Sequence, residues 1–274
     1  MENLKNIHLF QEKTEVLLKV LPNIPHFVGE TFVIKYTSLS DELLNAFARN
    51  VVLLKQLGIN PVIVNDGEYE INLVLKMLGI DSKFINNIRL TDKETMKIIE
   101  MVLCGSINKK IVDCINSVGG LAIGLCGKDG NLMKAEKIAT TVKTNDSSNI
   151  EKILDVGFVG NPVEINPDIL FFLEESDFIP VIAPVGYGKD GKTYHVDSDS
   201  VASIISVAVS ASKMIIFSET DEEVSTIKSS KISIKDLTTS ISDGKVIGRK
   251  LINRLAVCMK MVEECAGIAH IVDG

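Results

Sequence analysis

One stretch of this sequence matches a phosphate-binding motif letter for letter. Residues 186–193 read Gly-Tyr-Gly-Lys-Asp-Gly-Lys-Thr, which satisfies the pattern G-x-x-x-x-G-K-[ST] of nucleotide-binding P-loops. A true P-loop must open a helix at its Lys-Thr pair, so that free backbone N–H groups face the phosphates. Here Thr193 is followed by the strand-like residues 194–196. The sequence therefore favours a β-hairpin turn over a P-loop at this position.

Two basic residues elsewhere in the sequence lie next to the ends of predicted elements. Lys35 lies at the end of the β-branched run 31–36, where a long side chain can reach a ligand over the carboxyl edge of a parallel sheet. Arg89 places a fork-shaped guanidinium just before the predicted helix cap at 91–92. By itself, Arg89 also fits an ordinary surface ion pair.

Strand and helix patterns alternate along the chain, and these elements must position the cations. Short apolar runs predict strands at 31–36, 61–64, 121–125, 178–183, 214–217 and 269–272. Helical spacing predicts helices at about 11–21, 40–57, 70–78, 91–104, 108–116, 167–175, 198–211 and 246–265. Residues 137–144 and 155–160 are expected to be strands of a more antiparallel stretch. The alternation implies a mainly parallel sheet covered by helices on both faces.

Composition excludes several classes of protein. The 274 residues carry 29 Lys+Arg and 36 Asp+Glu, a net charge of −7, which argues against nucleic acid as a partner. The longest apolar runs fall short of the ~20 residues that span a bilayer, so we expect no membrane segment. The N-terminus lacks the pattern of a secretory signal, which predicts a cytoplasmic protein. The five cysteines form no C-x-x-C pair, so we expect packing residues and no metal site.

Taken in order, segments over nearly the whole chain resemble the amino-acid kinase family. The segments that carry the likeness are 15–17, 33–36, 58–64, 70–72, 91–96, 127–132, 157–160, 178–184 and 269–274. The resemblance implies an α/β fold, a three-layer α/β/α sandwich with a mainly parallel central sheet. The sequence most resembles arginine-sensitive members of this family. These members use MgATP to phosphorylate the side-chain carboxylate of N-acetyl-L-glutamate in arginine biosynthesis. The resemblance also implies that Mg²⁺ is held mainly by the phosphates of ATP.

The resemblance assigns roles to four residues of this chain. Lys35 matches the lysine that bridges the transferring phosphoryl group, where a cation offsets developing charge. Asp199 matches the aspartate that organises the catalytic lysines. Arg89 matches the arginine that binds the substrate carboxylate, and Gly67 matches a glycine of the loop beside the substrate.

Other positions depart from the family pattern. His195 replaces a substrate-binding asparagine, and Glu219 replaces an aspartate near the nucleotide. The second catalytic lysine of the family is expected near Gly248, where only Arg249 or Lys250 can substitute. We therefore assign His195 to the substrate site, and Glu219 and Lys250, together with Lys35, to the nucleotide site.

Two glycine-rich loops of the family are also altered. Thr37 and Ser38 replace a Gly-Gly pair after the first lysine, and Asn65-Asp66-Gly67-Glu68 replaces His-Gly-Gly-Gly. The second change adds two carboxylates beside a polyanionic ligand. Two hypotheses remain open: an active kinase, and a catalytically degenerate homologue that serves as a binding or regulatory protein.

The expected organisation is a single kinase domain over residues 1–274. We assign a substrate-binding lobe to about 30–175 and a nucleotide-binding lobe to about 176–274. The spacing of apolar residues in the predicted helix at about 11–21, taken alone, favours packing of this helix against its own domain. Its resemblance to the helix that links dimers into hexamers in arginine-sensitive relatives predicts a homo-oligomer, a dimer or a hexamer.

Overall fold

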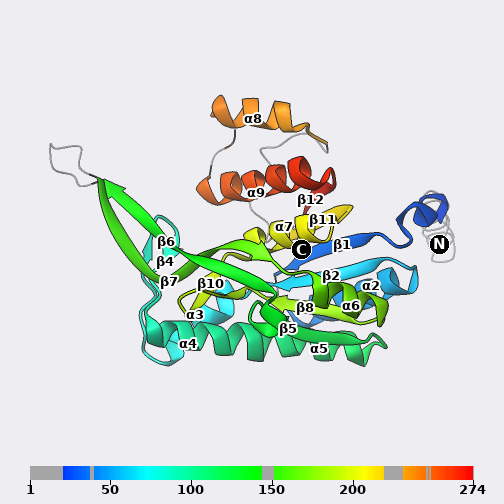
Figure 1. Ribbon diagram of the computed structural model, residues 1–274, viewed down its shortest axis with the longest axis horizontal. Coiled ribbons are helices and arrows are strands. Elements are labelled where there is room, and N and C mark those ends of the chain that lie inside the picture. The colour runs from blue at the N-terminus through cyan, green and yellow to red at the C-terminus, as the bar shows by residue number, and fades with distance from the viewer. Residues whose placement is uncertain are drawn as a thin grey trace, which may run out of the picture.

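A parallel six-stranded sheet forms the middle layer of the molecule (Figure 1). The computed structural model describes residues 21–37, 40–143, 151–218, 231–244, 246 and 248–273. The sheet strands, in order, are β12 (Ile268–Asp273), β11 (Lys213–Ser218), β1 (Thr31–Tyr36), β2 (Asn60–Asn65), β8 (Ile179–Ala183) and β5 (Ala122–Cys126). Every neighbouring pair in this sheet is parallel, so the carboxyl ends of all six strands lie on one edge.

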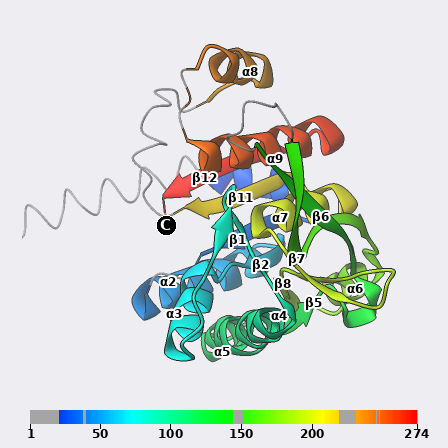
Figure 2. The same ribbon diagram turned by 90° about the vertical axis from the view of Figure 1, so that its left-hand side faces the viewer.

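Helices cover both faces of the sheet, and this arrangement confirms the predicted α/β/α sandwich (Figures 1 and 2). One face carries α2 (Asp41–Gln56), α3 (Glu68–Met77), α4 (Lys93–Glu100), the π-helix η2 (Met101–Ile107) and α5 (Asn108–Ser117). The other face carries α6 (Asp168–Glu175), α7 (Ser198–Ala208) and α9 (Arg249–Cys265), and α8 (Ile234–Ser242) packs on α9. Even α9, with 17 residues, lacks the length and apolar character to cross a membrane, and no other helix of the described ranges has them.

Alternation along the strands gives each face its own core. In β1, Ile34 belongs to the apolar cluster that contains Phe47 of α2, while the adjacent Val33 belongs to the cluster that contains Val201 of α7. Successive strand residues point to opposite faces, so a strand that is apolar at consecutive positions is buried on both sides. Lys35 interrupts this apolar run in β1 and is nevertheless 2% exposed, which marks it as a residue with a specific partner.

Four further strands close into a small barrel beside the main sheet. They are β6 (Met133–Lys143), β7 (Glu151–Ile165), β9 (Val185–Tyr187) and β10 (Thr193–Val196). Strands β9 and β10 pair antiparallel, and the Gly188 N–H donates to the Lys192 carbonyl at 2.8 Å. Gly191 takes a φ of 74° in the turn, a conformation that glycine adopts without strain. The P-loop-like motif is therefore a hairpin, as predicted.

Three short elements complete the structure: a 3₁₀ turn, η1 (Leu21–Phe27), another, η3 (Asp129–Asn131), and a two-stranded ribbon of β3 (Phe84–Ile85) and β4 (Ile88–Arg89). The separately predicted helices at 91–104 and 108–116 are one continuous helical run, because the π-helix η2 bridges them. The antiparallel strands are longer than expected, because β6 begins four residues before the predicted 137–144 and β7 extends beyond the predicted 155–160 at both ends. The predicted helix at 11–21 lies, except for its last residue, outside the described residues.

Candidate active site

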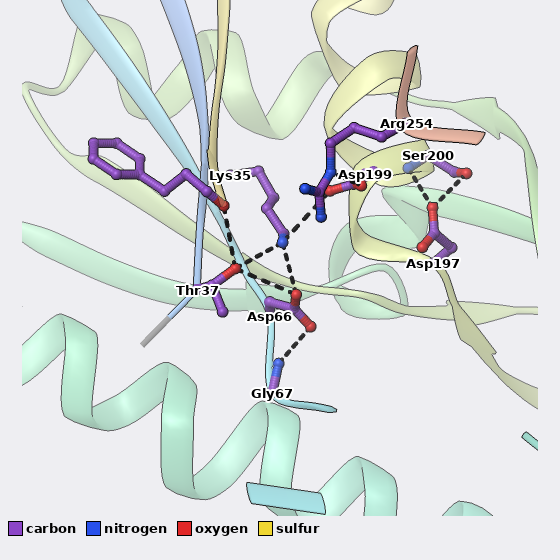
Figure 3. A network of polar contacts seen from close by, with 9 residues as sticks. Lys35, Thr37, Asp66, Gly67, Asp197, Asp199, Ser200 and Arg254 are labelled. Carbon is purple, nitrogen blue, oxygen red and sulfur yellow. Dashed lines mark hydrogen bonds and ion pairs between the residues drawn. The ribbon is translucent and has the colours of Figure 1, made fainter. Parts of the chain in front are cut away.

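The ammonium group of Lys35 lies at the carboxyl edge of the sheet, between two carboxylates (Figure 3). Its Nζ is 2.7 Å from Asp66 Oδ2 and 3.5 Å from Asp199 Oδ1. It also donates to Thr37 Oγ1 at 2.7 Å. Burial alone would lower the pKa of Lys35, but the charges of Asp66 and Asp199 outweigh it and raise that pKa. Lys35 is therefore a fully charged cation at this edge.

Asp66 comes from the loop that follows β2. Since β1 and β2 pair in parallel, with Lys35 opposite Val64, the residue after β2 falls directly beside the Lys35 side chain. The backbone N–H of Gly67 donates to Asp66 Oδ1 at 2.7 Å. Burial alone would raise the pKa of Asp66, but the charge of Lys35 holds it well below the usual range. Asp66 is thus a permanent anion in contact with the candidate catalytic lysine.

Asp199 sits in the first turn of α7 and joins two cations. Its Oδ2 accepts a hydrogen bond from Arg254 Nε at 2.9 Å, while its Oδ1 faces Lys35. Arg254 is 5% exposed and comes from α9. A carboxylate near a helix N-terminus is also favoured by the helix dipole. Asp199 therefore fixes the relative positions of two basic side chains that come from β1 and from α9.

The neighbouring Asp197 caps α7. Its side chain accepts hydrogen bonds from the Ser200 backbone N–H at 2.8 Å and from Ser200 Oγ at 2.7 Å, as an N-cap residue does. The protein atoms around it and the charge of Asp199 raise the pKa of Asp197. Asp197 thus holds the start of the helix that carries Asp199, and Figure 3 shows its carboxylate bonded to Ser200.

Arg89 is a buried cation at the end of β4. It is 5% exposed, its Nη1 donates to Ser82 Oγ at 2.7 Å, and its guanidinium lies 4.6 Å from the Phe84 ring centre. Burial lowers the pKa of Arg89, yet a guanidinium stays protonated in proteins. Within the described ranges Arg89 makes no ion pair. A buried cation without a carboxylate partner is a candidate anion site.

A close backbone contact fixes the chain just after Arg89. Thr91 pairs with β7: its N–H donates to the Val156 carbonyl at 2.9 Å, and its carbonyl accepts from Phe158 at 2.7 Å. Gly157 lies between them with a φ of 86°, and a Cβ there would stand 1.9 Å from the Thr91 carbonyl oxygen. Only glycine allows this approach. The β7 strand thereby anchors the segment that presents Arg89.

Gly67 and a buried amide pair support the loop that carries Asp66. A Cβ on Gly67 would lie 2.2 Å from Ile107 Cδ1, so the loop packs directly on the π-helix η2. At the end of β2, Asn65 Oδ1 accepts a hydrogen bond from Asn108 Nδ2 at 3.0 Å. The same Nδ2 also donates to the Val181 carbonyl at 2.8 Å. Both asparagines are fully buried. These contacts tie the end of β2 to α5 and to β8, and they restrict where Asp66 can go.

His195 lies in β10 and faces the charges of Arg89 and Asp66. Burial lowers the pKa of His195 to about 4, and the nearby charge of Arg89 acts in the same direction. The imidazole is therefore a neutral hydrogen-bonding group at neutral pH, as the asparagine it replaces would be. His195, Arg89 and Asp66 come from β10, β4 and the loop after β2.

We expect the His195 imidazole to remain neutral between about pH 5.5 and 8, because its pKa of about 4 lies far below the ordinary 6.5. The stabilisation from this depressed pKa is present above 6.5 and is lost as the pH falls toward 4. An NMR titration of the imidazole, assigned with His195→Asn, checks this. A midpoint near 6.5 would contradict the environment described for His195.

The structure brings together most of the residues that the sequence singled out. Lys35 and Asp199 are in contact, and Gly67 adjoins Asp66 beside them. Lys250 is exposed at the start of α9 and lowers the pKa of Asp66 by its charge. Glu219 lies outside the described residues.

Sequence reasoning missed the roles of two residues, Asp66 and Arg254. The basic residue in contact with Asp199 is Arg254, one helical turn beyond Lys250 on the same face of α9. The i, i+4 spacing of these two cations is the signal that could have found it. The sequence shows Asp66 only as an added charge, whereas the parallel pairing of β1 and β2 puts this residue, one position after β2, beside Lys35.

Comparisons with known proteins agree with this fold. The model of the amino acid kinase family matches residues 30–222. Acetylglutamate kinase of Ehrlichia canis is 50% identical over 268 residues, which are 95% of this chain and 82% of that protein. Acetylglutamate kinase of Parvibaculum lavamentivorans is 43% identical over 270 residues, 96% of this chain and 88% of that protein.

Solved structures support the fold independently of close sequence similarity. The structure of smu.665 from Streptococcus mutans superposes on this chain with a TM-score of 0.72 at 23% sequence identity. The superposition covers 89% of this chain and 95% of the smu.665 chain. The chain folds as a parallel sheet between helical layers, and it belongs to the amino acid kinase family. Within that family it groups with the acetylglutamate kinases.

Proposed function

We propose that the chain transfers the γ-phosphoryl group of ATP to the side-chain carboxylate of N-acetyl-L-glutamate. Acetylglutamate kinases about half identical over most of the chain support this activity. Lys35 stabilises charge on the transferring group, since a fixed cation acts most strongly where water is excluded. Asp199 holds Lys35 and Arg254 at a fixed separation, so both cations are positioned before the substrates bind.

The observation that best supports an acceptor site is the environment of Arg89. Arg89 is a buried guanidinium without an ion-pair partner among the described residues, and the neutral His195 lies near it. A carboxylate of the substrate supplies the missing partner in a bidentate geometry that arginine favours. His195 adds an uncharged hydrogen-bonding group. Gly67, which has no side chain, lets the loop after β2 pack closely against η2.

The nucleotide side of the site fits a polyphosphate. Lys35 and Arg254 are buried cations on either side of Asp199, and the exposed Lys250 lies on the same face of α9 as Arg254. Bound ATP supplies the phosphoryl group, and Mg²⁺ offsets its charge. The described residues contain no group of three metal-ligating side chains. We therefore propose that the phosphates themselves hold Mg²⁺, and that Glu219 and Lys250 lie beside the nucleotide.

A matched pair of acceptors tests the proposed reaction. ADP release from MgATP is measured with N-acetyl-L-glutamate and with N-acetyl-L-glutamine, which differs by an amide in place of the side-chain carboxylate. We expect ADP release with the first compound and only the background rate with the second. Equal rates with both compounds would mean that the side-chain carboxylate is not the acceptor.

The division of labour within the domain follows from this assignment. We propose that residues of about 30–175, with Gly67 and Arg89, bind the acceptor, and that about 176–274, with Arg254 and Lys250, bind the nucleotide. His195, from the second segment, also lies near Arg89. Lys35 comes from the first segment and Asp199 from the second, and their contact joins the two segments at the site.

We also propose that the chain forms a homo-oligomer, and that α3 contributes to a contact between copies. Tyr69, Leu73 and Met77 recur every four residues on α3, and they are 68%, 41% and 74% exposed. Such an apolar stripe is unfavourable in water unless another surface covers it.

Changing Leu73 and Met77 to aspartate is expected to reduce the particle to a monomer, because two charges would be buried in the contact. Light scattering coupled to size-exclusion chromatography measures the mass. The matched control changes the exposed Lys76 of the same helix to glutamate and should leave the mass unaltered. A wild-type monomer would contradict the proposal of an oligomer, and an unaltered mass in the double variant would contradict the place assigned to α3.

A further inference from the structure

Three oxygen atoms of the chain itself surround the Lys35 ammonium group. They are Asp66 Oδ2 and Thr37 Oγ1, each at 2.7 Å, and Asp199 Oδ1 at 3.5 Å. An ammonium group offers three hydrogen bonds, and Asp66 and Thr37 accept two of them, whereas Asp199 Oδ1 lies at ion-pair distance and accepts no hydrogen bond from the described residues. The Lys35 side chain is 2% exposed, so protein atoms leave its ammonium group almost no open side. Because of this burial, a phosphoryl oxygen can contact Lys35 directly only if one of the three neighbouring groups gives up its place.

Asp66 is the group best placed to leave. Asp199 is 12% exposed and is held on its other oxygen by Arg254, so it cannot move without breaking a buried ion pair. Thr37 is neutral and offers no repulsion to an anion. Asp66 is 23% exposed, and its second oxygen binds only the backbone N–H of the adjacent Gly67 among the contacts described for it. It is also an anion at the position where another anion must bind.

We propose that Asp66 is a resident competitor for the γ-phosphoryl group: its carboxylate occupies the Lys35 contact that the γ-phosphoryl group needs, and it must be exchanged before transfer. This inference rests on the proposed function, in which Lys35 contacts the transferring group. Repulsion between two unit charges at 4 Å corresponds to about a fivefold loss of binding even in water, and to more where water is excluded. Removing the charge should therefore improve binding about tenfold.

Asp66→Asn tests the proposal, because asparagine keeps the size of the side chain and an oxygen for the Gly67 N–H. Calorimetry measures the Kd of the magnesium complex of a non-hydrolysable β,γ-imido analogue of ATP, and of MgADP. We expect the analogue to bind about tenfold more tightly to Asp66→Asn than to the wild type. The affinity for MgADP, which lacks the γ-phosphoryl group, should change less than twofold.

Glu68→Gln is the matched control. Glu68 is an exposed carboxylate of the same loop, two residues away, and makes no ion pair with Lys35. Its removal should change the affinity for the analogue less than twofold. An equal gain from Glu68→Gln, or an equal gain for MgADP, would show a long-range charge effect and overturn the proposal.

Weaker or unchanged binding of the analogue by Asp66→Asn would also overturn it, because Asp66 would then position Lys35 instead of competing for it. A lack of nucleotide binding by both proteins contradicts the proposal as well. The binding measurement does not depend on turnover. A tenfold gain in a protein that never phosphorylates N-acetyl-L-glutamate would uphold the role of Asp66 and reject the proposed function.

Discussion

Replacing Lys35 with methionine is expected to lower turnover by about 10³-fold, the size of effect seen when a fixed cation or hydrogen-bond donor is removed from a transferring group. Methionine fills much of the same space without the charge. The rate constant for ADP formation at saturating MgATP and N-acetyl-L-glutamate measures the effect. A loss of less than about tenfold would mean that Lys35 does not stabilise the transferring group.

A second variant separates this catalytic loss from a loss of folding. Lys35→Met leaves Asp66 and Asp199 without their shared cation, which costs stability. The double variant Lys35→Met, Asp66→Asn removes one of these charges as well, so its free energy of unfolding should recover. Its turnover should stay as low as that of the single variant. Recovery of turnover together with stability would show that the lysine has only a structural role.

Replacing Arg254 with methionine is expected to lower turnover about 100-fold and to destabilise the fold. Arg254 and Asp199 form a buried pair at 2.9 Å, and removing one partner of such a pair costs about 3–5 kcal/mol. The released Asp199 also loses its fixed position beside Lys35. Chemical denaturation measures the free energy of unfolding, and the rate at saturating substrates measures turnover.

Arg254→Lys is the control for charge. A lysine keeps the cation opposite Asp199 but lacks the planar guanidinium. We expect it to retain turnover within about tenfold of the wild type, with most of the stability, because the charge is the part that acts on the phosphates. Undiminished turnover in Arg254→Met would remove Arg254 from the site and restore Lys250 as the candidate for the second cation.

The architecture follows from sequence patterns because burial imposes them. Strands such as 31–36 are apolar at consecutive positions, and only a strand covered on both faces needs that pattern. The hairpin at 186–193 was predictable for a similar reason, since no helix begins at Thr193. The continuous run through η2 was not, because a π-helix has no distinct sequence period.

The site was predictable where a single residue carries a role, and less so where partners decide it. The place of Lys35 at the end of β1 and that of Arg89 just before the cap of α4 followed from the predicted element boundaries, and their expected roles followed from the family resemblance. The contacts of Asp66 and Arg254 depend on strand pairing and on the direction of α9 across the sheet. A sequence pattern specifies neither which strands pair nor how α9 crosses the sheet. The two altered loops therefore suggested lost function, whereas the structure shows a complete network of charges around Lys35.

The central claim is that this network still transfers a phosphoryl group to N-acetyl-L-glutamate. The most direct test incubates the purified protein with MgATP and N-acetyl-L-glutamate and traps the acyl phosphate with hydroxylamine. Aspartate, carbamate and the Lys35→Met variant are the controls. We predict a hydroxamate that requires both N-acetyl-L-glutamate and Lys35. A folded wild-type protein that forms no hydroxamate would contradict the account and would favour a homologue that binds ligands without catalysis.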